Sequence, residues 1–252
     1  MPAPTETILI LGGTAEANQL VSRIRIMRPD ARIVLSLAGR TATPVLPEGC
    51  AVRVGGFGGA NGLATFLTQE GITHLVDATH PFAAGISRNA ARAAEVADVP
   101  RVALVRPAWE PRVGDRWTRV ACLGDACDAL PAKARPLLAL GRQHLAPFAR
   151  RSDLDLVVRM IDPPDPLLPF PAEIVLGRPS PDADEEAELL QRLGVTHLVC
   201  RNSGGAASYA KVEAARRRGL PVIMIERPPS APPPVAGSIN EVLTLLGIPL
   251  SA

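Results

Sequence analysis

Cysteine and aromatic residues are scarce in this chain. Aromatic side chains make up 3% of the 252 residues, and the four cysteines are scattered, without a C-x-x-C pair. Such spacing builds neither a disulfide framework nor a zinc ribbon, so reduced thiols and a cytoplasmic location are expected. Since no H-E-x-x-H motif, Ser-His-Asp order or Cys/His cluster stands out, we expect no metal site and no hydrolytic chemistry.

Net charge and long apolar runs are lacking as well. The formal charge is +2 at pH 7, and no basic run exceeds Arg216-Arg217-Arg218, which argues against nucleic acid or a membrane surface as a partner. No stretch approaches the roughly 18 consecutive apolar residues of a membrane-spanning helix. The opening MPAPTETILILGG has no basic segment ahead of an apolar one, so no secretion signal is expected. A monomer is the default expectation, and the oligomeric state stays open.

What the chain does contain is apolar material and many turns. Hydrophobic residues reach 47%, with 21 Gly and 26 Pro, which suits one large domain or two compact ones. In the first half, short apolar runs alternate with Ala-rich amphipathic stretches, as in parallel βα units. Strands are predicted at 8–11, 32–37, 51–54, 74–76 and 101–105, and helices at 15–27, 61–70 and 83–97.

The second half shows the same alternation. Strands are predicted at 137–140, 156–160, 173–176, 198–200 and 222–225, and helices at 182–193 and 206–218. Residues 107–120 are rich in Pro, Gly and Trp, which favours a connector or a short antiparallel piece. We therefore predict two Rossmann-like α/β domains with doubly wound parallel sheets, residues 1–114 and residues 115–252.

The two halves are related by an internal repeat. GITHLV at 71–76 matches GVTHLV at 194–199, with His197 following His74 at an offset of 123. Further along, Arg88 corresponds to Lys211, and Arg106-Pro107 corresponds to Arg227-Pro228. The repeat predicts two domains related by duplication, with the active-site cleft between them. His74 and His197 open their strands at the opposite edge and are expected to be structural.

The last part of the chain is a proline-rich segment, RPPSAPPP at 227–234, followed by a predicted helix at 238–246 with Ser238 as its N-cap. Two interpretations stay open. The segment carries the chain back to the first half, or it is a stiff surface spacer before a packing helix.

A phosphate-binding turn is predicted after the first strand. Gly12, Gly13, Thr14 and Ala15 lie where a strand gives way to a helix N-terminus, whose free N–H groups and dipole favour a phosphate. The adjacent glycines depart from G-x-G-x-x-G. A tight βα turn capped by Thr14 is the alternative interpretation.

The second strand indicates which dinucleotide would bind. No acid is present between Ala31 and Pro47, where an NAD enzyme places a ribose-binding carboxylate. The residues there are suited instead to a 2′-phosphate, so NADPH is the expected cofactor; they are Ser36, Gly39, Arg40, Thr41 and Thr43. An ordinary solvated loop arginine is the alternative for Arg40.

The fourth strand of each half ends in unusual sequence at the carboxyl edge, which borders the ligand crevice in open α/β sheets. DATHPF at 77–82 contributes Asp77, Thr79, His80, Pro81 and Phe82, and RNSGG at 201–205 contributes Arg201, Asn202, Ser203 and Gly204. Arg88 and Lys211 add positive charge, with solvated helix charge as the alternative. Arg142 and His144 occupy the turn that matches Gly13-Thr14, and they suit an acidic substrate.

Five segments resemble the precorrin-6A reductase family, which includes the cobalt-precorrin-6A reductases: GGTAEA (12–17), DATHPFAAGISRNA (77–90), RPAWEP (106–111), LLALGRQHL (137–145) and RNSGGAASYAK (201–211). The resemblance implies NADPH-dependent reduction of precorrin-6A to precorrin-6B in cobalamin biosynthesis. It also implies a tetrapyrrole whose carboxylates pair with Arg88, Arg106, Arg142, Arg201, Lys211 and Arg227. His80, Asp77 and Tyr209 are the candidate proton donors, and water and a substrate carboxylate stay open as alternatives. An NADP-dependent oxidoreductase of another polyanion, or a binder of acidic ligands without turnover, are the alternatives.

Overall fold

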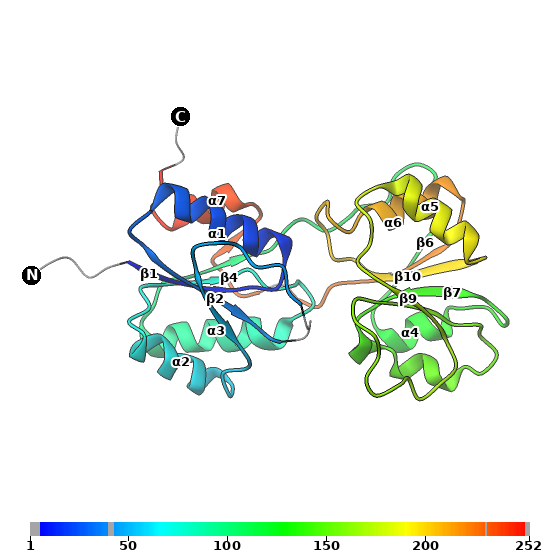
Figure 1. Ribbon diagram of the computed structural model, residues 1–252, viewed down its shortest axis with the longest axis horizontal. Helices are drawn as coiled ribbons and strands as arrows, with labels where there is room; N and C mark the ends of the chain where they lie inside the picture. The colour runs from blue at the N-terminus through cyan, green and yellow to red at the C-terminus, as the bar shows by residue number, and fades with distance from the viewer. Residues whose placement is uncertain (1–5, 40–42, 230, 250–252) are drawn as a thin grey trace, which may run out of the picture. The chain divides into compact units, whose positions relative to one another are not determined.

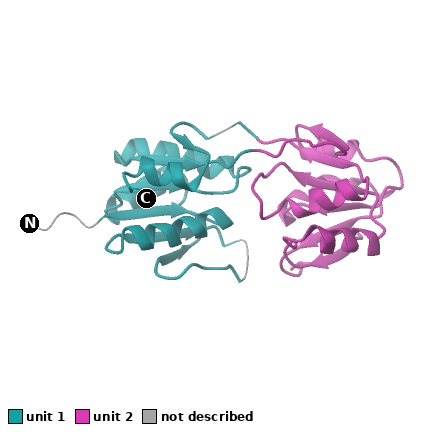
Figure 2. Ribbon diagram, turned by 90° about the horizontal axis from the view of Figure 1, so that it is seen from above, with its two compact units in different colours: residues 1–107, 228–252 teal, residues 108–227 magenta. Residues whose placement is uncertain are grey.

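The structure is a computed structural model that describes residues 6–39, 43–229 and 231–249. The chain divides into two compact units. Unit 1 comprises Met1–Pro107 and Pro228–Ala252, and unit 2 comprises Ala108–Arg227 (Figure 2). Each unit is built on its own six-stranded parallel sheet (Figure 1).

The sheet of unit 1 runs, from edge to edge, through β12 (Val235–Ala236), β5 (Arg101–Leu104), β4 (His74–Asp77), β1 (Thr7–Leu11), β2 (Arg32–Leu37) and β3 (Ala51–Val54). Its helices are α1 (Ala15–Met27) and α7 (Ile239–Leu245) on one face, and α2 (Ala60–Gln69) and α3 (Ala84–Ala97) on the other (Figure 1). Ile8 and Ile10 of β1 join the core under α1 and α7. Leu9 and Leu11 join the core under α2 and α3. This alternation follows from the two-residue period of a strand, and burial on both faces explains why β1 is apolar throughout.

The sheet of unit 2 runs through β6 (Trp117–Val120), β11 (Val222–Ile225), β10 (His197–Arg201), β7 (Pro136–Ala139), β8 (Val157–Met160) and β9 (Glu173–Leu176). Its helices are α4 (Leu123–Asp128), α5 (Ala183–Arg192) and α6 (Ala210–Arg217). Leu190 of α5 and Val212 of α6 pack with Leu198 in one apolar cluster. The first turn of α5 is acidic, because Asp182 caps the helix and Asp184, Glu185 and Glu186 follow.

The two units repeat the same strand order, which confirms the predicted duplicated doubly wound fold. The repeat extends to side chains at the amino edge. Thr73 Oγ1 lies 3.0 Å from His74 Nδ1, and Thr196 Oγ1 lies 2.9 Å from His197 Nδ1. Each threonine also bonds the strand beside it, at Thr7 and at Arg135 respectively. These contacts fit the structural roles expected for both histidines.

The sixth strand of each sheet comes from the other repeat. The strand β6 follows the first repeat along the chain but pairs with β11 of the second. The strand β12 follows the second repeat but pairs with β5 of the first, where Val105 N donates to Ala236 O at 2.8 Å. The chain therefore changes units after Pro107 and after Arg227, the two Arg-Pro pairs that correspond in the repeat.

This exchange differs from the expected boundary after residue 114. Residues 228–249, assigned from sequence to the second domain, complete unit 1 instead. Of the two interpretations of the proline-rich segment, the structure agrees with the first, in which the segment carries the chain back to the first half. Residues 117–120 are also a parallel strand and not an antiparallel piece. Pairing with an open parallel edge is a long-range property that a short run of mixed residues does not reveal.

Candidate functional site

The turn between β1 and α1 has two glycines with different constraints. A Cβ at Gly12 would lie 2.5 Å from Leu35 Cδ1, so close packing excludes a side chain there. Gly13 has φ +99°, and a Cβ built on it would meet no atom within 4 Å. A left-handed conformation with open space beside it exposes the backbone of this turn.

The Thr14 side chain caps α1, and its hydroxyl is paired both as a donor and as an acceptor. Its Oγ1 accepts from Ala17 N at 3.1 Å and donates to Ala78 O at 2.8 Å. The backbone N–H groups of Gly13, Thr14 and Ala15 have no hydrogen-bond partner within the described part of the chain. Three unpaired donors at the N-terminus of a 13-residue helix fit a phosphate group. Thr14 thus satisfies both interpretations, because its side chain caps the helix while its backbone stays available.

The carboxyl end of β2 carries no acid among the described residues 36–39 and 43–47. Ser36 is buried, and its carbonyl accepts from Gly12 N at 2.9 Å. Gly39, with φ +73°, and Thr43 are exposed. Arg40 and Thr41 lie outside the described residues. The predicted 2′-phosphate site therefore remains a prediction, supported by the absence of a carboxylate at residues 36–39.

Sequence reasoning missed the loop after β3. Arg53 donates to Gly55 O at 2.6 Å and to Gly56 O at 2.7 Å, and its guanidinium lies 3.8 Å from the centroid of the Phe57 ring. The loop lies beside the end of β2, since Gly55 N donates to Leu37 O at 2.9 Å. The run GGFGG at 55–59 was the signal that could have found it, because Gly55, Gly58 and Gly59 all have positive φ.

The end of β4 is a hydrogen-bonded turn. Asp77 is buried, and its Oδ1 accepts from Thr79 Oγ1 at 2.6 Å and from Thr79 N at 3.2 Å. His80 Nδ1 accepts from Phe82 N at 3.2 Å. A neutral imidazole that accepts at Nδ1 carries its proton on Nε2. His80, Pro81 and Phe82 are half-buried, so this turn presents an imidazole N–H beside apolar surface.

The corresponding turn of unit 2 is built differently. The strand β7 leads through Gly141, with φ −70°, into a 3₁₀ turn at Arg142–His144 and not into an α-helix. Arg142 donates to the carbonyls of Asp165 and Pro166, which fixes the loop between β8 and β9. At this turn, unit 2 therefore lacks the helix N-terminus that unit 1 offers to a phosphate.

Arg201 and His144 lie together at the carboxyl edge of unit 2. Arg201 Nη1 is 3.1 Å from His144 Nε2. Because a guanidinium only donates, His144 accepts at Nε2 and is neutral in this arrangement. Arg227 Nε donates to Asn202 O at 2.7 Å, and Ser203 Oγ donates to Arg201 O at 3.3 Å. The predicted cluster of donors thus forms around the end of β10.

Lys211 and Tyr209 have protein partners inside unit 2. Lys211 is buried, donates to Ser208 O and lies 5.1 Å from the centroid of the Trp109 ring, and burial lowers its pKa. The Tyr209 hydroxyl accepts from Arg216 of the same helix region. Tyr209 belongs to unit 2, whereas His80 and Asp77 belong to unit 1.

The two remaining basic candidates of unit 1 differ sharply. Arg88, in the second turn of α3, is exposed and has no ion pair or hydrogen bond within the described residues. Arg106 forms an ion pair with Glu16 at 2.6 Å. Lys211, the counterpart of Arg88 in the repeat, is buried, so the two positions have diverged.

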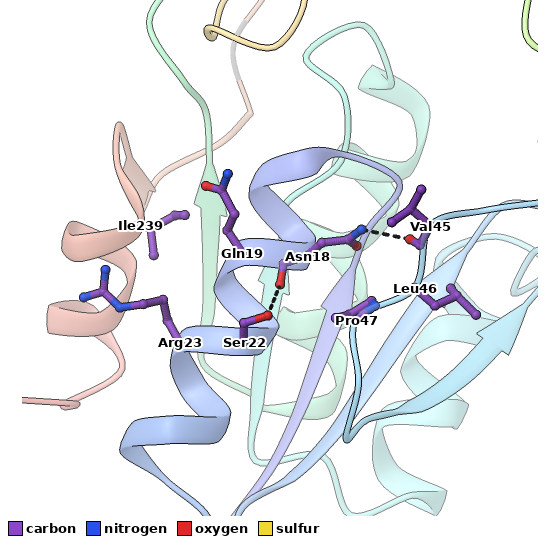
Figure 3. Close-up of a pocket in the computed structure, with 8 residues that line it drawn as sticks. All are labelled: Asn18, Gln19, Ser22, Arg23, Val45, Leu46, Pro47 and Ile239. Atoms are coloured by element: carbon purple, nitrogen blue, oxygen red, sulfur yellow. Dashed lines mark hydrogen bonds between the residues drawn. The ribbon is translucent and has the colours of Figure 1, made fainter. Parts of the chain in front are cut away.

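A hollow of about 470 Å³ lies over the outer side of α1 (Figure 3). Asn18 Nδ2 donates to Val45 O at 2.8 Å and ties the neighbouring loop to the helix. None of the predicted site residues lines the hollow. It is lined by Asn18, Gln19, Ser22, Arg23, Val45, Leu46, Pro47 and Ile239.

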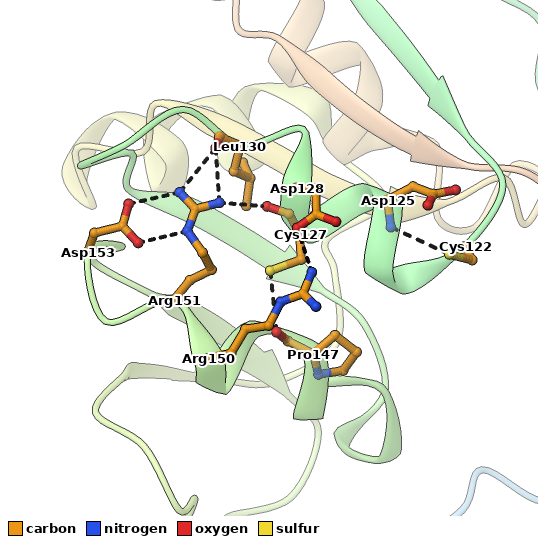
Figure 4. A network of polar contacts seen from close by, with 9 residues as sticks. All are labelled: Cys122, Asp125, Cys127, Asp128, Leu130, Pro147, Arg150, Arg151 and Asp153. Carbon is orange, nitrogen blue, oxygen red and sulfur yellow. Dashed lines mark hydrogen bonds and ion pairs between the residues drawn. The ribbon is translucent and has the colours of Figure 1, made fainter.

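A polar network in unit 2 joins α4 to the segment that follows residue 145 (Figure 4). Arg151 donates to the carbonyls of Cys127 and Leu130 and pairs with Asp153 at 2.7 Å. The Arg151 guanidinium lowers the pKa of Asp153 to about 2. These residues bond one another, so the network stabilises the packing of α4 against the segment after residue 145. Within the described ranges, no group of three or more His, Cys, Asp or Glu could hold a metal ion, and no helix there is both long and apolar enough to span a membrane.

Fold and site together define a two-unit α/β protein with a dinucleotide-type turn in one unit and a basic cluster in the other. Residues 7–247 match the family described as precorrin-6x reductase CbiJ/CobK. The chain is 47% identical to a precorrin-6A reductase of Sinorhizobium sp. over 94% of its length and 90% of that protein. It is 46% identical to a precorrin-6A reductase of Rhodococcus erythropolis over 93% and 94%. A solved structure of CobK precorrin-6A reductase superposes with a TM-score of 0.91 and 41% identity, over 96% of each chain. The chain belongs to the precorrin-6x reductase CbiJ/CobK family and is an oxidoreductase.

Proposed function

We propose that the chain reduces precorrin-6A to precorrin-6B with NADPH. Family membership and the names of its relatives support the substrate. The observation that carries the cofactor is the turn at Gly13–Thr14–Ala15, with three unpaired N–H groups at a helix N-terminus and no carboxylate at the end of the neighbouring strand β2.

The residues of unit 1 fit a dinucleotide. The N–H groups of Gly13, Thr14 and Ala15 would bind its diphosphate, and the open space beside Gly13 allows close approach. Arg40, Thr41 and Thr43 are proposed to contact the 2′-phosphate. NADPH supplies the hydride when bound. The protein's contribution is to orient the donor and to exclude water.

Two basic residues are the preferred candidates to bind the carboxylates of the tetrapyrrole. Arg88 is exposed with no partner in the described chain, and Arg201 donates to a neutral histidine. Arg142 and Arg227 donate to backbone carbonyls, so a ligand must share their donors.

His80 is the proposed proton donor. Its Nδ1 accepts from Phe82 N, which places the ring proton of the neutral imidazole on Nε2. Asp77 accepts two hydrogen bonds from Thr79, and Tyr209 is bonded to Arg216. Both side chains are therefore engaged by residues of their own units.

The test is incubation of the purified chain with precorrin-6A and NADPH, followed by the mass of the product. A gain of two hydrogens together with NADPH oxidation is expected. Consumption of NADPH only with a different polyanion, or binding of precorrin-6A without reduction, would contradict the proposal.

The variant Arg40→Ala tests the 2′-phosphate site separately. It should weaken the binding of NADPH much more than the binding of NADH, and equal weakening of both would remove Arg40 from the phosphate site.

A further inference from the structure

Arg106 pairs with an acid beside the proposed phosphate site. Its Nη1 lies 2.6 Å from Oε2 of Glu16, and the two side chains are 14% and 22% exposed. Glu16 is the second residue of α1, directly after the turn whose N–H groups are unpaired. Arg106 follows β5, so the pair joins the start of α1 to the segment after β5, a strand separated from β1 by β4.

A carboxylate at this position has two opposed effects. In the first turn of a helix, it is stabilised by the positive end of the helix dipole. A diphosphate bound at the same turn carries like charge, so an unpaired Glu16 would disfavour it. The effect is strengthened by partial burial, which reduces screening by water and salt.

We infer that Arg106 is a positioning residue for the cofactor. It neutralises Glu16, so that the N-terminus of α1 can accept the diphosphate of the dinucleotide, and it holds that turn against the end of β5. The inference rests on the proposed function, and it replaces the role that the family resemblance implies for Arg106, a ligand of substrate carboxylates. The two roles differ in which affinity depends on the residue.

Charge-matched variants separate them. NADPH is titrated against the purified chain without precorrin, by the fluorescence of the reduced nicotinamide, and the rise in thermal unfolding midpoint on adding NADPH is measured in parallel. Arg106→Gln should weaken NADPH binding about tenfold, because it leaves Glu16 unpaired. Glu16→Gln should tighten binding roughly two- to fivefold, because it removes a negative charge beside the bound phosphates. The double variant should bind within about twofold of the unmodified chain.

Arg32 and Glu70 provide the matched control. They form an ion pair of the same length, 2.6 Å, but at the opposite edge of the sheet. Glu70→Gln should leave NADPH affinity unchanged. If Arg106→Gln proves too unstable to measure, Glu16→Gln and the double variant still test the inference.

The inference is overturned if the double variant binds NADPH as weakly as Arg106→Gln, or if Glu16→Gln weakens binding. It is also overturned if Arg106→Gln spares NADPH affinity and raises the KM for precorrin-6A, which would assign Arg106 to the substrate. Failure of the unmodified chain to bind NADPH would instead refute the proposed function, and that result is seen before any variant is made.

Discussion

Both ends of the Asn202 side-chain amide form hydrogen bonds with the backbone of Trp109. Oδ1 accepts from Trp109 N at 2.8 Å, and Nδ2 donates to Trp109 O at 3.0 Å, in fully buried surroundings. Trp109 in turn donates from its indole to Gly205 O at 2.8 Å. The segments RPAWEP and RNSGG are therefore in contact, and Asn202 orders the first residues of unit 2.

Replacing Asn202 by Asp tests this role. The carboxylate would face the Trp109 carbonyl without a donor, and a buried unsatisfied pair of this kind costs about 1–3 kcal/mol. We expect the urea midpoint of unfolding to fall by a corresponding amount. Ser203→Ala, at the neighbouring position, is the control and should change the midpoint much less. Equal stability of Asn202→Asp and the unmodified chain would contradict the assignment.

Arg53 is expected to support the adenosine half of NADPH. Its bonds to Gly55 O and Gly56 O order a loop at the end of β3, beside the strand end where the ribose is proposed to bind. Arg53→Met should raise the KM for NADPH about tenfold. Loss of the two hydrogen bonds is expected to cost about 1.4 kcal/mol of binding free energy, which corresponds to that factor. Reduced nicotinamide mononucleotide lacks the adenosine half, so its KM should stay the same. A similar rise for both donors would show that Arg53 acts on the fold as a whole.

The buried thiol of Cys200 should make the free energy of unfolding depend on pH in the alkaline range. Burial raises its pKa from 9.0 to about 11. Between those values the unfolded chain loses this proton and the folded chain keeps it, so the free energy of unfolding falls as pH rises. The loss amounts to about 2–3 kcal/mol by pH 11. Cys200→Ala should lack it, and urea unfolding at pH 8, 9, 10 and 11 measures the difference. Parallel curves for the two chains would contradict the prediction.

The pairing of β12 with β5 and of β6 with β11 predicts which parts of the chain fold on their own. The core of unit 1 contains Ala236, Val242, Leu243 and Ile248 from the C-terminal segment. A chain of residues 6–107 joined to 228–249 by a short linker should therefore unfold cooperatively. Residues 1–114, the domain expected from sequence, leave the edge of β5 unpaired and this core open, and they should be unfolded or aggregate. Cooperative thermal unfolding of 1–114 would contradict the exchange.

Local pattern was enough to predict much of the fold. The strand at 32–37 and the helix at 15–27 begin and end as expected, because burial on both faces and a capped amphipathic repeat leave strong signals. Ser238 caps α7 as predicted, accepting from Glu241 N at 3.2 Å. The helix α4 was missed because it is only six residues long, too short for a period to be read.

The candidate site was predictable in position but not in its pairings. Strand ends identified the turns at Gly13 and His80 in unit 1 and at Arg201 in unit 2, since parallel strands bring their carboxyl ends to one edge of their own sheet. Nothing in the spacing showed that Arg106 meets Glu16, that Arg142 bonds the loop carbonyls, or that Lys211 is buried beneath Trp109. Each of these contacts joins residues of different elements, and a basic side chain looks the same in sequence whether it faces water or a neighbour.

Residue order alone predicted the two repeated α/β halves and the glycine turn after the first strand, and it showed the lack of an acid between Ala31 and Pro47. Those features follow from burial, periodicity and backbone chemistry within a few residues of one another. The tertiary structure decided which sheet receives β6 and β12, and which arginines already hold a carboxylate or a carbonyl. Both depend on edges and charges that meet only after the chain has folded back across more than a hundred residues, as between Ala103 and Pro234.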